Sequence, residues 1–353
     1  MDFIGIDGSG GEGGGQILRT SMTLATIFQK PVKITKIRAG RRQPGLRPQH
    51  LQAVLVTSKL CGGEVQGASV GSTEVEYMPG AAREPFRKTV DVGSAGSLSL
   101  ILQTIIPLSI FRNQDLDLRL IGGTEVPNSP TLDYLEKLVI PVYERLGAMI
   151  QLTIQRRGYY PRGGGIVLLK CSKSFDSKPL VFPEPVKENS EIKIQSVSRN
   201  LPDHVAKRQA ETARKLLFDS GYSSVNFTLD VAGESSSPGS SMLIYSRNEA
   251  KLIGASSLGE RGKRAELVGE EAALKFIMEI SNFPNVDTHL ADMLITVLSC
   301  VPGKSVFRAS EITDHFRTNA EVAKKISGCK IDFRKEERLF CVEMEGTSPE
   351  KAN

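Results

Sequence analysis

Gly8-Ser-Gly-Gly-Glu-Gly-Gly-Gly-Gln-Ile-Leu-Arg19 is the stretch that decides how this chain begins to fold. Six of the eight positions from Gly8 to Gly15 are glycine, and Glu12 is the one carboxylate among them. A short apolar strand precedes the stretch, and an apolar helix follows it from Gln16. A glycine-rich turn between a strand and a helix N-terminus exposes backbone N–H groups that hold anions. The pattern therefore predicts either an anion-binding loop or a tight structural corner.

The side chains of this loop favour the anion-binding interpretation. No Lys-Ser or Lys-Thr pair follows the glycines, and their spacing is not that of a dinucleotide-binding turn, so neither common phosphate motif is present. Glu12 offers a cation ligand, whereas Gln16 and Arg19 offer groups that pair with anions. A solvated Glu12 in a plain corner is the alternative.

The composition is that of an ordinary globular protein. The 353 residues exceed one average domain core, so two domains or an internal repeat are expected. Hydrophobic residues make up 40% of the chain and charged residues 24%, and the net charge is +5. This mildly basic balance is compatible with a polyanionic partner but does not require one.

Cysteine usage and hydropathy indicate a cytoplasmic protein. The five cysteines are odd in number and form no C-x-x-C pair, which favours reduced thiols over a disulfide framework or a zinc site. The N-terminus lacks a basic region followed by an apolar one, so no signal peptide is expected. The most apolar stretch, Leu98 to Phe111, is interrupted by Ser, Gln and Pro and is too short to cross a bilayer. We therefore expect no membrane association.

One unit of helix, strand, helix and two strands recurs three times. An additional strand leads the first two copies, at 3–6 and 88–92. One-sided helices of this kind are buried by packing on a sheet, so we predict an α/β fold of two-layer units, each with two helices and a four-stranded sheet. The predicted helices are 16–28 and 49–60, 98–108 and 131–146, and 289–300 and 320–326, and the strands that follow the first helix of each copy are 32–37, 116–120 and 305–309.

The spacing of the copies predicts an insertion before the third. The first two copies start about 80 residues apart, whereas the third starts about 200 residues later. We predict a repeat-built core at 1–180 and 282–345, with units at about 1–80, 86–171 and 286–345, a small α/β insertion at 181–281, and a flexible tail at 346–353. Within the insertion, strands are expected at 191–197, 224–230 and 241–245, helices at about 206–218 and 262–279, and a mobile Ser-rich loop at 233–241.

The turn between the first strand and the second helix is polar in every copy. If the copies pack around a pseudo-threefold axis, these equivalent turns converge at one end and assemble a site from distant residues. The turns contain Arg38, Arg41, Arg42, Arg47, Gln49 and His50 in the first copy, Thr124, Glu125, Asn128, Ser129 and Asp133 in the second, and Thr313, Asp314, His315, Arg317, Thr318 and Asn319 in the third.

His315 is the candidate nucleophile, although a single histidine is more often a surface or packing residue. It lies just before Thr318-Asn-Ala-Glu321, which has the form of a capping box, so we expect it on a turn ahead of the helix. His289 and Asp292 are three residues apart and share a helix face, which fits either a metal pair or a helix cap. Gln103 lies on an otherwise apolar helix and needs a polar partner.

The arginine cluster of the first copy is the candidate for binding a phosphate. It places four guanidiniums within ten positions, in a loop shaped by Gly and Pro, and guanidiniums match phosphate oxygens bidentately. A solvated charge run is the alternative. The cluster lacks the interleaved aromatic residues of a single-strand stacking platform, so we expect recognition of a terminal phosphate and its ribose, not of base sequence.

Several further motifs occur in the order in which one known family has them. They are Ile37-Arg-Ala-Gly-Arg41, Pro44-Gly-Leu-Arg-Pro-Gln-His50, Gly93-Ser-Ala-Gly-Ser97 with Gln103, Gly122-Gly-Thr124, Tyr160-Pro-Arg-Gly-Gly-Gly165, Leu290-Ala-Asp292 and His315-Phe-Arg-Thr-Asn319. With its glycine-rich opening, the chain resembles the RNA 3′-terminal phosphate cyclase family over most of its length outside the insertion. The resemblance implies three repeated units plus an inserted domain.

The resemblance also implies an activity and a site. The activity is the ATP-dependent conversion of an RNA 3′-phosphate to a 2′,3′-cyclic phosphate, in which His315 accepts AMP and Asp292 orients His315 or the ribose. The family usually has Tyr where His289 stands and Gln where Met293 stands, so nucleotide contacts there are expected to differ. Tyr134 suits adenine stacking and a core position equally well. The expected contacts are Arg19, Gln103, Pro130, Tyr134, His289, Leu290, Ala291, Asp292 and Met293 for ATP, Arg38, Arg41, Gln49 and His50 for the RNA phosphate, and Glu12 for a divalent cation, Mg²⁺ or Mn²⁺.

Two other functions compete with this one. Non-catalytic relatives that act in ribosome assembly lack the nucleophilic histidine, so the presence of His315 argues against them. An enolpyruvyl-transferase-like enzyme would need about six copies of a small α/β unit, and this chain has three. The expected partner is an RNA 3′-phosphate end, and the oligomeric state is left open, with a homodimer among the options.

Overall fold

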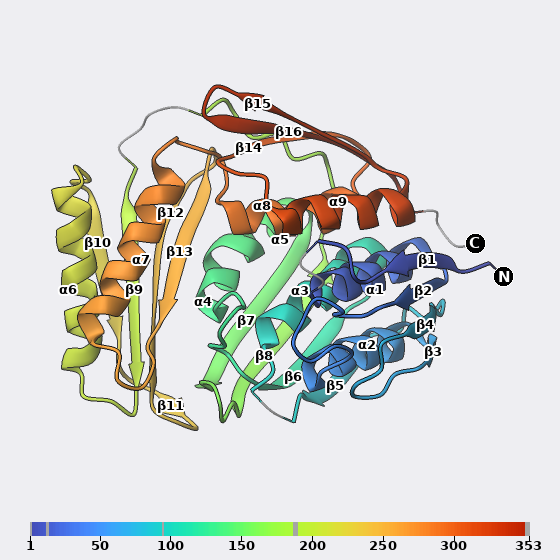
Figure 1. The fold of residues 1–353 in the computed structure, drawn as a ribbon, viewed down its shortest axis with the longest axis horizontal. Coiled ribbons are helices and arrows are strands. Elements are labelled where there is room, and N and C mark those ends of the chain that lie inside the picture. Colours follow the sequence, from blue (N-terminus) through green and yellow to red (C-terminus); the bar gives the residue numbers. More distant parts are fainter. Residues whose placement is uncertain (1, 12–13, 94, 186–189, 350–353) are drawn as a thin grey trace.

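The computed structural model describes residues 2–11, 14–93, 95–185 and 190–349, and its mixed helices and sheets confirm the α/β class (Figure 1). Figure 1 shows the first unit at the lower right, the second in the centre, the third along the top and the inserted segment at the left. Among the described residues, no helix is both long and apolar enough to cross a membrane.

The first two units share one sheet topology. In the first, the strand order is β1-β2-β4-β3, with β1 parallel to β2, and in the second the equivalent order is β5-β6-β8-β7, with β5 parallel to β6. The first unit consists of β1 (Ile4–Asp7), α1 (Gln16–Phe28), β2 (Val32–Thr35), α2 (Pro48–Cys61), β3 (Glu64–Gln66) and β4 (Val75–Met78). The second consists of β5 (Phe86–Asp91), α3 (Leu98–Arg112), β6 (Leu116–Gly122), α4 (Leu132–Tyr134), the π-helix η1 (Leu135–Val139), α5 (Ile140–Arg145), β7 (Ala148–Arg157) and β8 (Gly165–Lys173).

The helix expected at 131–146 is broken by a π-helical turn. Pro141 stands at the start of α5 and lacks the N–H that a continuous α-helix would donate. The backbone N–H of Ile140 bonds to the carbonyl of Leu135, five residues back, which is the π-helical pattern.

The third unit differs from the predicted four-stranded sheet. It consists of α8 (Thr288–Leu298), β14 (Gly303–Ala309), α9 (Asp314–Ser327), β15 (Lys330–Glu336) and β16 (Leu339–Gly346), and its strand order is β14-β16-β15. The place of the leading strand is taken by a short parallel bridge from Val181 to Val306. Pro179 and Pro183 flank this bridge and cannot donate to a ladder, which limits the pairing. We therefore propose that residues 180–182 belong to the third unit and that the insertion follows them.

The inserted segment has its own sheet and its own apolar core. Its strand order is β10-β9-β12-β13, and α6 and α7 pack together and against this sheet. One apolar cluster is confined to this segment, whereas a larger one includes buried residues of all three repeated units. The elements are β9 (Ile192–Arg199), α6 (His204–Asp219), β10 (Val225–Asp230), β11 (Glu234–Ser235), β12 (Gly239–Arg247), β13 (Leu252–Leu258) and α7 (Ala265–Ile280).

Two of the described segments are more firmly held than the sequence indicated. The Ser-rich loop contains β11, which pairs with β7, and the Ser235 hydroxyl donates to the carbonyl of Arg157 at 3.1 Å. At the other end, Gly346 closes β16, and the Thr347 hydroxyl donates to the carbonyl of Ser327 at 2.8 Å. The tail expected from 346 is therefore bonded to the core as far as Thr347.

The start of α9 corrects the sequence analysis. The helix begins at Asp314, six residues before the expected Ala320, and Thr313 is its N-cap, with its hydroxyl accepting from the N–H of Phe316 at 2.9 Å. Thr318 is inside the helix and donates its hydroxyl to the carbonyl of Asp314. The predicted capping box at 318–321 is therefore wrong, and His315 lies in the first turn of α9.

Candidate active site

The glycine-rich loop lies against the first turn of α9. A Cβ atom at Gly11 would be 2.2 Å from Thr318 Oγ1, and one at Gly14 would be 3.3 Å from Arg41 Nη2 and 3.9 Å from His315 Cε1. The loop at residues 38–47 of the first unit, which we call the arginine loop, and His315 of the third unit therefore meet at Gly14. The predicted cation ligand, Glu12, lies outside the described residues.

Position 15 requires glycine because the side chains of His50 and Arg19 approach its backbone and leave no space for a Cβ atom. A Cβ atom there would be 2.2 Å from His50 Nε2 and 3.0 Å from Arg19 Nη1. His50 is buried, and its Nδ1 accepts the N–H of Arg47 at 3.2 Å. Burial, followed by the charges of Arg19, Arg38 and Arg47, lowers the pKa of His50 to about 3. His50 is therefore neutral and shapes the loop where α2 begins.

Among the residues that the structure describes, none balances the charge of Arg19. Its side chain is half-buried, and burial lowers its pKa to about 10, so it stays protonated. Within the described ranges no carboxylate lies at ion-pair distance from Arg19. A guanidinium held away from water without a partner is stabilised by an incoming anion.

The other predicted phosphate-binding residues have structural contacts as well. Arg38 has a left-handed backbone (φ 56°), and its Nη1 donates to the carbonyls of Gln43 and Gly45 at 2.8 and 2.9 Å, which curls the loop. Burial, followed by the charges of Arg47 and Arg41, lowers the pKa of Arg38.

Gln49 joins this loop to the second unit. Its Oε1 accepts the N–H of Ser97 at 3.2 Å. A Cβ atom at Gly96 would be 2.9 Å from the Cβ of Gln49, so the two loops are in close contact. The start of α2 and the loop that follows β5 therefore form one continuous surface.

A hydrogen-bond chain fixes the position of α9 beside α1 and α8. The Thr313 hydroxyl donates to Asp292 Oδ1 at 2.7 Å while it caps Phe316. Asn319 Nδ2 donates to the carbonyl of Asp292 at 3.0 Å, and its Oδ1 accepts the Thr20 hydroxyl at 2.5 Å. Asp292 thus bonds the residue that caps the helix carrying His315, and burial raises its pKa to about 7.

The cap of α8 is Asp287, which the sequence analysis missed. Its Oδ1 accepts the N–H of Leu290 at 2.9 Å and the Tyr134 hydroxyl at 2.6 Å, and its Oδ2 accepts the N–H of Gly254 at 2.9 Å. Burial raises the pKa of Asp287. The Asp287-Thr-His-Leu290 sequence has an ordinary capping form and could have been recognised.

The residues predicted to contact ATP lie near these helices. His289 is exposed in the first turn of α8, whereas Leu290 and Ala291 are buried. Tyr134 is buried with its hydroxyl on Asp287, as expected of a core residue. The structure gives no support to the interpretation of His289 as part of a metal site. Among the described residues, no group of three or more His, Cys, Asp or Glu side chains is placed to hold a metal ion.

Gln103 shows the feature that a ligand contact requires. Its Nε2 is buried and has no hydrogen-bond partner among the described residues. A buried donor without a partner is costly, so an acceptor is expected to reach it. Pro130 is half-buried at the neighbouring turn, where its carbonyl accepts the Ser99 hydroxyl at 2.6 Å.

Two carboxylates of the second unit's polar turn, Glu125 and Asp133, do not join the site. Instead of converging with the other two turns, Glu125 and Asp133 form buried ion pairs with Arg157. Gln195 of the inserted segment also donates to Asp133 Oδ1, at 2.9 Å. The structure therefore brings together the turns of the first and third units, whereas Glu125 and Asp133 of the second turn lie toward the insertion.

Comparison with known proteins identifies the family. The model of the family described as RNA 3′-terminal phosphate cyclase matches residues 10–333. The chain belongs to this family. An RNA 3′-terminal phosphate cyclase of Ignicoccus hospitalis is 42% identical over 330 residues, which is 92% of either chain. One of Thermococcus kodakarensis is 42% identical over 330 residues, 93% of this chain and 94% of its own, and one of Pyrobaculum aerophilum is 39% identical over 346 residues, 97% and 98%.

Proposed function

We propose that this chain is an ATP-dependent enzyme of the ligase class, which converts an RNA 3′-terminal phosphate to a 2′,3′-cyclic phosphodiester and releases AMP and pyrophosphate. Membership of the family and the names of its relatives support this proposal. The structural observation that carries it is the meeting of Gly14, Arg41 and His315 at the first turn of α9. An imidazole beside a guanidinium and a glycine-rich backbone is an arrangement that suits nucleophilic attack on a phosphate, which supports His315 as the proposed nucleophile.

The proposed reaction has three displacements at phosphorus. A neutral imidazole nitrogen of His315 attacks the α-phosphorus of ATP, the P–N bond forms, and pyrophosphate leaves. An oxygen of the RNA 3′-phosphate then attacks the same phosphorus, which breaks the P–N bond and gives RNA-(3′)pp(5′)A. Finally the adjacent 2′-OH loses its proton and attacks the RNA phosphorus, the cyclic ester forms, and AMP leaves.

Two features of the described residues fit bound ATP. The unpartnered Nε2 of Gln103 can donate to a nucleotide acceptor, and the unbalanced charge of Arg19 can pair with a phosphate. We propose the remaining ATP contacts at Pro130, Tyr134 and residues 289–293. A divalent cation, Mg²⁺ or Mn²⁺, would neutralise charge on the leaving pyrophosphate, and Glu12 is its proposed ligand.

For the RNA end we propose Arg38, Arg41, Gln49 and His50. Of these, Arg41 approaches Gly14 together with His315. Arg38, Gln49 and His50 contribute through the loop geometry that their hydrogen bonds maintain.

Incubation of the pure protein with α-labelled ATP and a divalent cation tests the proposed function. Label that stays on the protein in base and is lost in acid is expected, because a phosphoramidate has this stability. A 3′-phosphorylated oligonucleotide should then be converted to its cyclic form. RNA binding with neither labelling nor cyclisation would instead show the non-catalytic protein of ribosome assembly that we consider the alternative.

Arg41→Ala is expected to separate the two half-reactions. If Arg41 holds the RNA phosphate, self-adenylation persists while cyclisation falls about tenfold to hundredfold, equivalent to the loss of roughly 1.5–3 kcal/mol from one charge-assisted contact. The loss should be alike for all RNA sequences, since phosphate contacts carry no base information. Arg261→Ala, which changes an exposed arginine of the inserted segment, is the matched control. An equal loss of self-adenylation would place Arg41 on ATP instead.

Asp292→Leu is expected to slow self-adenylation about tenfold to hundredfold, because Thr313 loses its acceptor and the first turn of α9 shifts relative to ATP. Asp292→Asn keeps an acceptor oxygen and should retain most of the rate. Single-turnover labelling measures both, with the ATP dependence of the rate separating binding from the chemical step. Equal losses in the two variants would show that the carboxylate itself contacts the nucleotide.

A further inference from the structure

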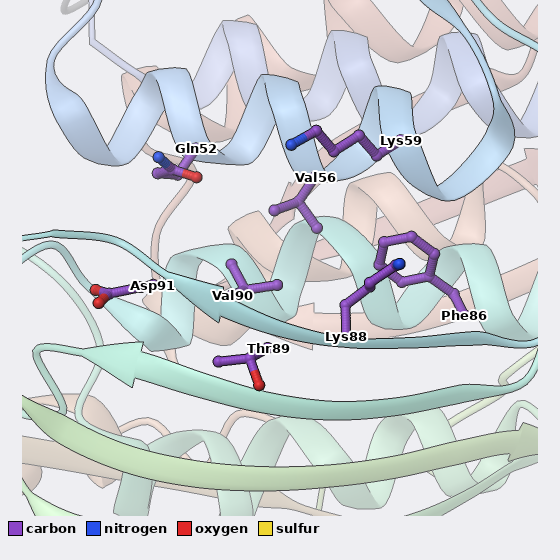
Figure 2. Close-up of a pocket in the computed structure, with 8 residues that line it drawn as sticks. All are labelled: Gln52, Val56, Lys59, Phe86, Lys88, Thr89, Val90 and Asp91. Atoms are coloured by element: carbon purple, nitrogen blue, oxygen red, sulfur yellow. The ribbon is translucent and has the colours of Figure 1, made fainter.

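A groove of about 630 Å³ lies between α2 and β5 (Figure 2). Among the strands of the described residues, β5 is the last of its sheet and pairs with β6 alone, so the groove runs along a sheet edge. Figure 2 shows Lys59 on one wall and Lys88 with Phe86 on the other. The lining of the groove includes Gln52 and Lys59 of α2 and Phe86, Lys88 and Asp91 of β5.

One end of the groove is continuous with the site. Gln49, which bonds Ser97, lies three residues before Gln52 on α2 and hence on the same helix face. Asp91, at the same end of the groove, accepts the N–H of Gly93 at 2.7 Å, where the chain turns toward Ser97. The groove therefore begins where the arginine loop ends and leads away along β5.

The charges and rings of the groove suit a nucleic acid. Lys59 and Lys88 are exposed on opposite walls, and neither forms an ion pair with another described residue. Phe86 is half-buried beside them. The carboxylate of Asp91 stands only at the end and is bonded to Gly93. Two cations and an aromatic ring along one track are the elements that bind a phosphate backbone and stack its bases.

We propose that this groove binds the RNA chain immediately upstream of its 3′-terminal phosphate, with Lys59 and Lys88 on backbone phosphates and Phe86 stacked on a base. The proposal rests on the cyclase function proposed above. β5 advances ~3.3 Å per residue, so Phe86 to Asp91 spans about 17 Å, enough for roughly five stacked nucleotides at ~3.4 Å each. The cyclised end points to the arginine loop and the body of the RNA toward Lys59.

The test compares long and short substrates with the full-length protein. In the double variant Lys59→Gln and Lys88→Gln, we expect KM for a 3′-phosphorylated decamer to rise about tenfold, and the slope of its affinity against salt to become shallower by about one per lysine. KM for a dinucleotide 3′-phosphate and self-adenylation with ATP should stay unchanged. Lys215→Gln with Lys275→Gln, two exposed lysines of α6 and α7, is the matched control.

The outcomes separate this proposal from the function on which it rests. An equal rise of KM for both substrates, or none for either, overturns the groove as an RNA track. An extended peptide added to the free edge of β5 would then be the remaining occupant. If the unmodified protein shows no cyclisation, anisotropy of a labelled decamer still decides, because loss of binding in the double variant and not in the control supports the groove by itself.

Discussion

Replacing His315 with alanine is expected to abolish covalent labelling by α-labelled ATP. Removal of an enzyme nucleophile costs several orders of magnitude in rate, so we expect a loss of at least about 10⁴-fold. Cyclisation of RNA should fall with it, because the second displacement needs the enzyme-bound AMP. His315 is half-buried in the first turn of α9, where Thr313 supplies the cap, so the variant should fold normally.

The control is another histidine in a similar setting. His204 is exposed at the first position of α6, in the inserted segment, and His204→Ala should keep full labelling. Unfolding by urea, followed by circular dichroism, should give the same midpoint for both variants and the unmodified protein. Persistent labelling of His315→Ala would mean that a different residue accepts the nucleotide, with the exposed His289 the first to examine.

Local patterns in the sequence were enough for most of the elements. The helix predicted from Gln16 to Phe28 is present with these bounds as α1. The segment has a continuously apolar face, and the glycines stop before it. The strand β13 was missed because Leu-Ile-Gly-Ala-Ser-Ser-Leu has no alternation of apolar and polar residues. It is specified by its partner β12 across the sheet, and that long-range pairing leaves no local signal.

The start of α9 shows why the site was harder to predict. Both Thr313 and Thr318 fit the N-cap preference, so the local signal is ambiguous. The choice is made by Asp292, which binds the Thr313 hydroxyl from α8, more than twenty positions earlier in the chain. Tertiary contacts of this kind decide helix ends, and no single-sequence pattern contains them.

The sequence predicted only in part which polar turns of the three repeated units meet at the site. Equivalent polar turns pointed to convergence, and the first and third turns do meet through Gly14. The second turn is diverted because Arg157, at the end of β7, is buried and requires carboxylates. Nothing in the neighbourhood of Arg157 in the sequence indicates that it faces Glu125 and Asp133, which lie on other elements.

This buried cluster joins the second unit to the insertion. Arg157 donates to Glu125 and to both oxygens of Asp133, at 2.9 and 2.8 Å for the latter, and reaches Asp230 of β10 at 3.4 Å. Burial alone would lower the pKa of Arg157, but the facing carboxylates raise it well above its usual value. Burial raises the pKa of Glu125 to about 7. The charge of Arg157 opposes this rise in the pKa of Glu125.

Arg157→Met is expected to lower the free energy of unfolding by about 3–5 kcal/mol, because it leaves buried carboxylates without a counter-charge. Urea unfolding measures the loss, and Arg208→Met, which removes a solvent-exposed pair with Glu266, should change little. Glu125→Gln in the Arg157→Met background should recover part of the stability, since one uncompensated charge is removed. An additive loss in the double variant would contradict the coupling.

The deficit of Arg157→Met should also depend on pH, with a definite sign. Without the guanidinium, the folded-state pKa of Glu125 rises further above its unfolded value, so the folded variant binds more protons than the unfolded chain from about pH 4.5 to above 7. Stability falls with rising pH wherever the folded state holds the extra proton. The variant should therefore lose more relative to the unmodified protein at pH 8 than at pH 5.5, and limited proteolysis should cut the inserted segment faster at pH 8. A deficit independent of pH would show that lost packing of the Arg157 side chain, not the buried charge, causes the instability.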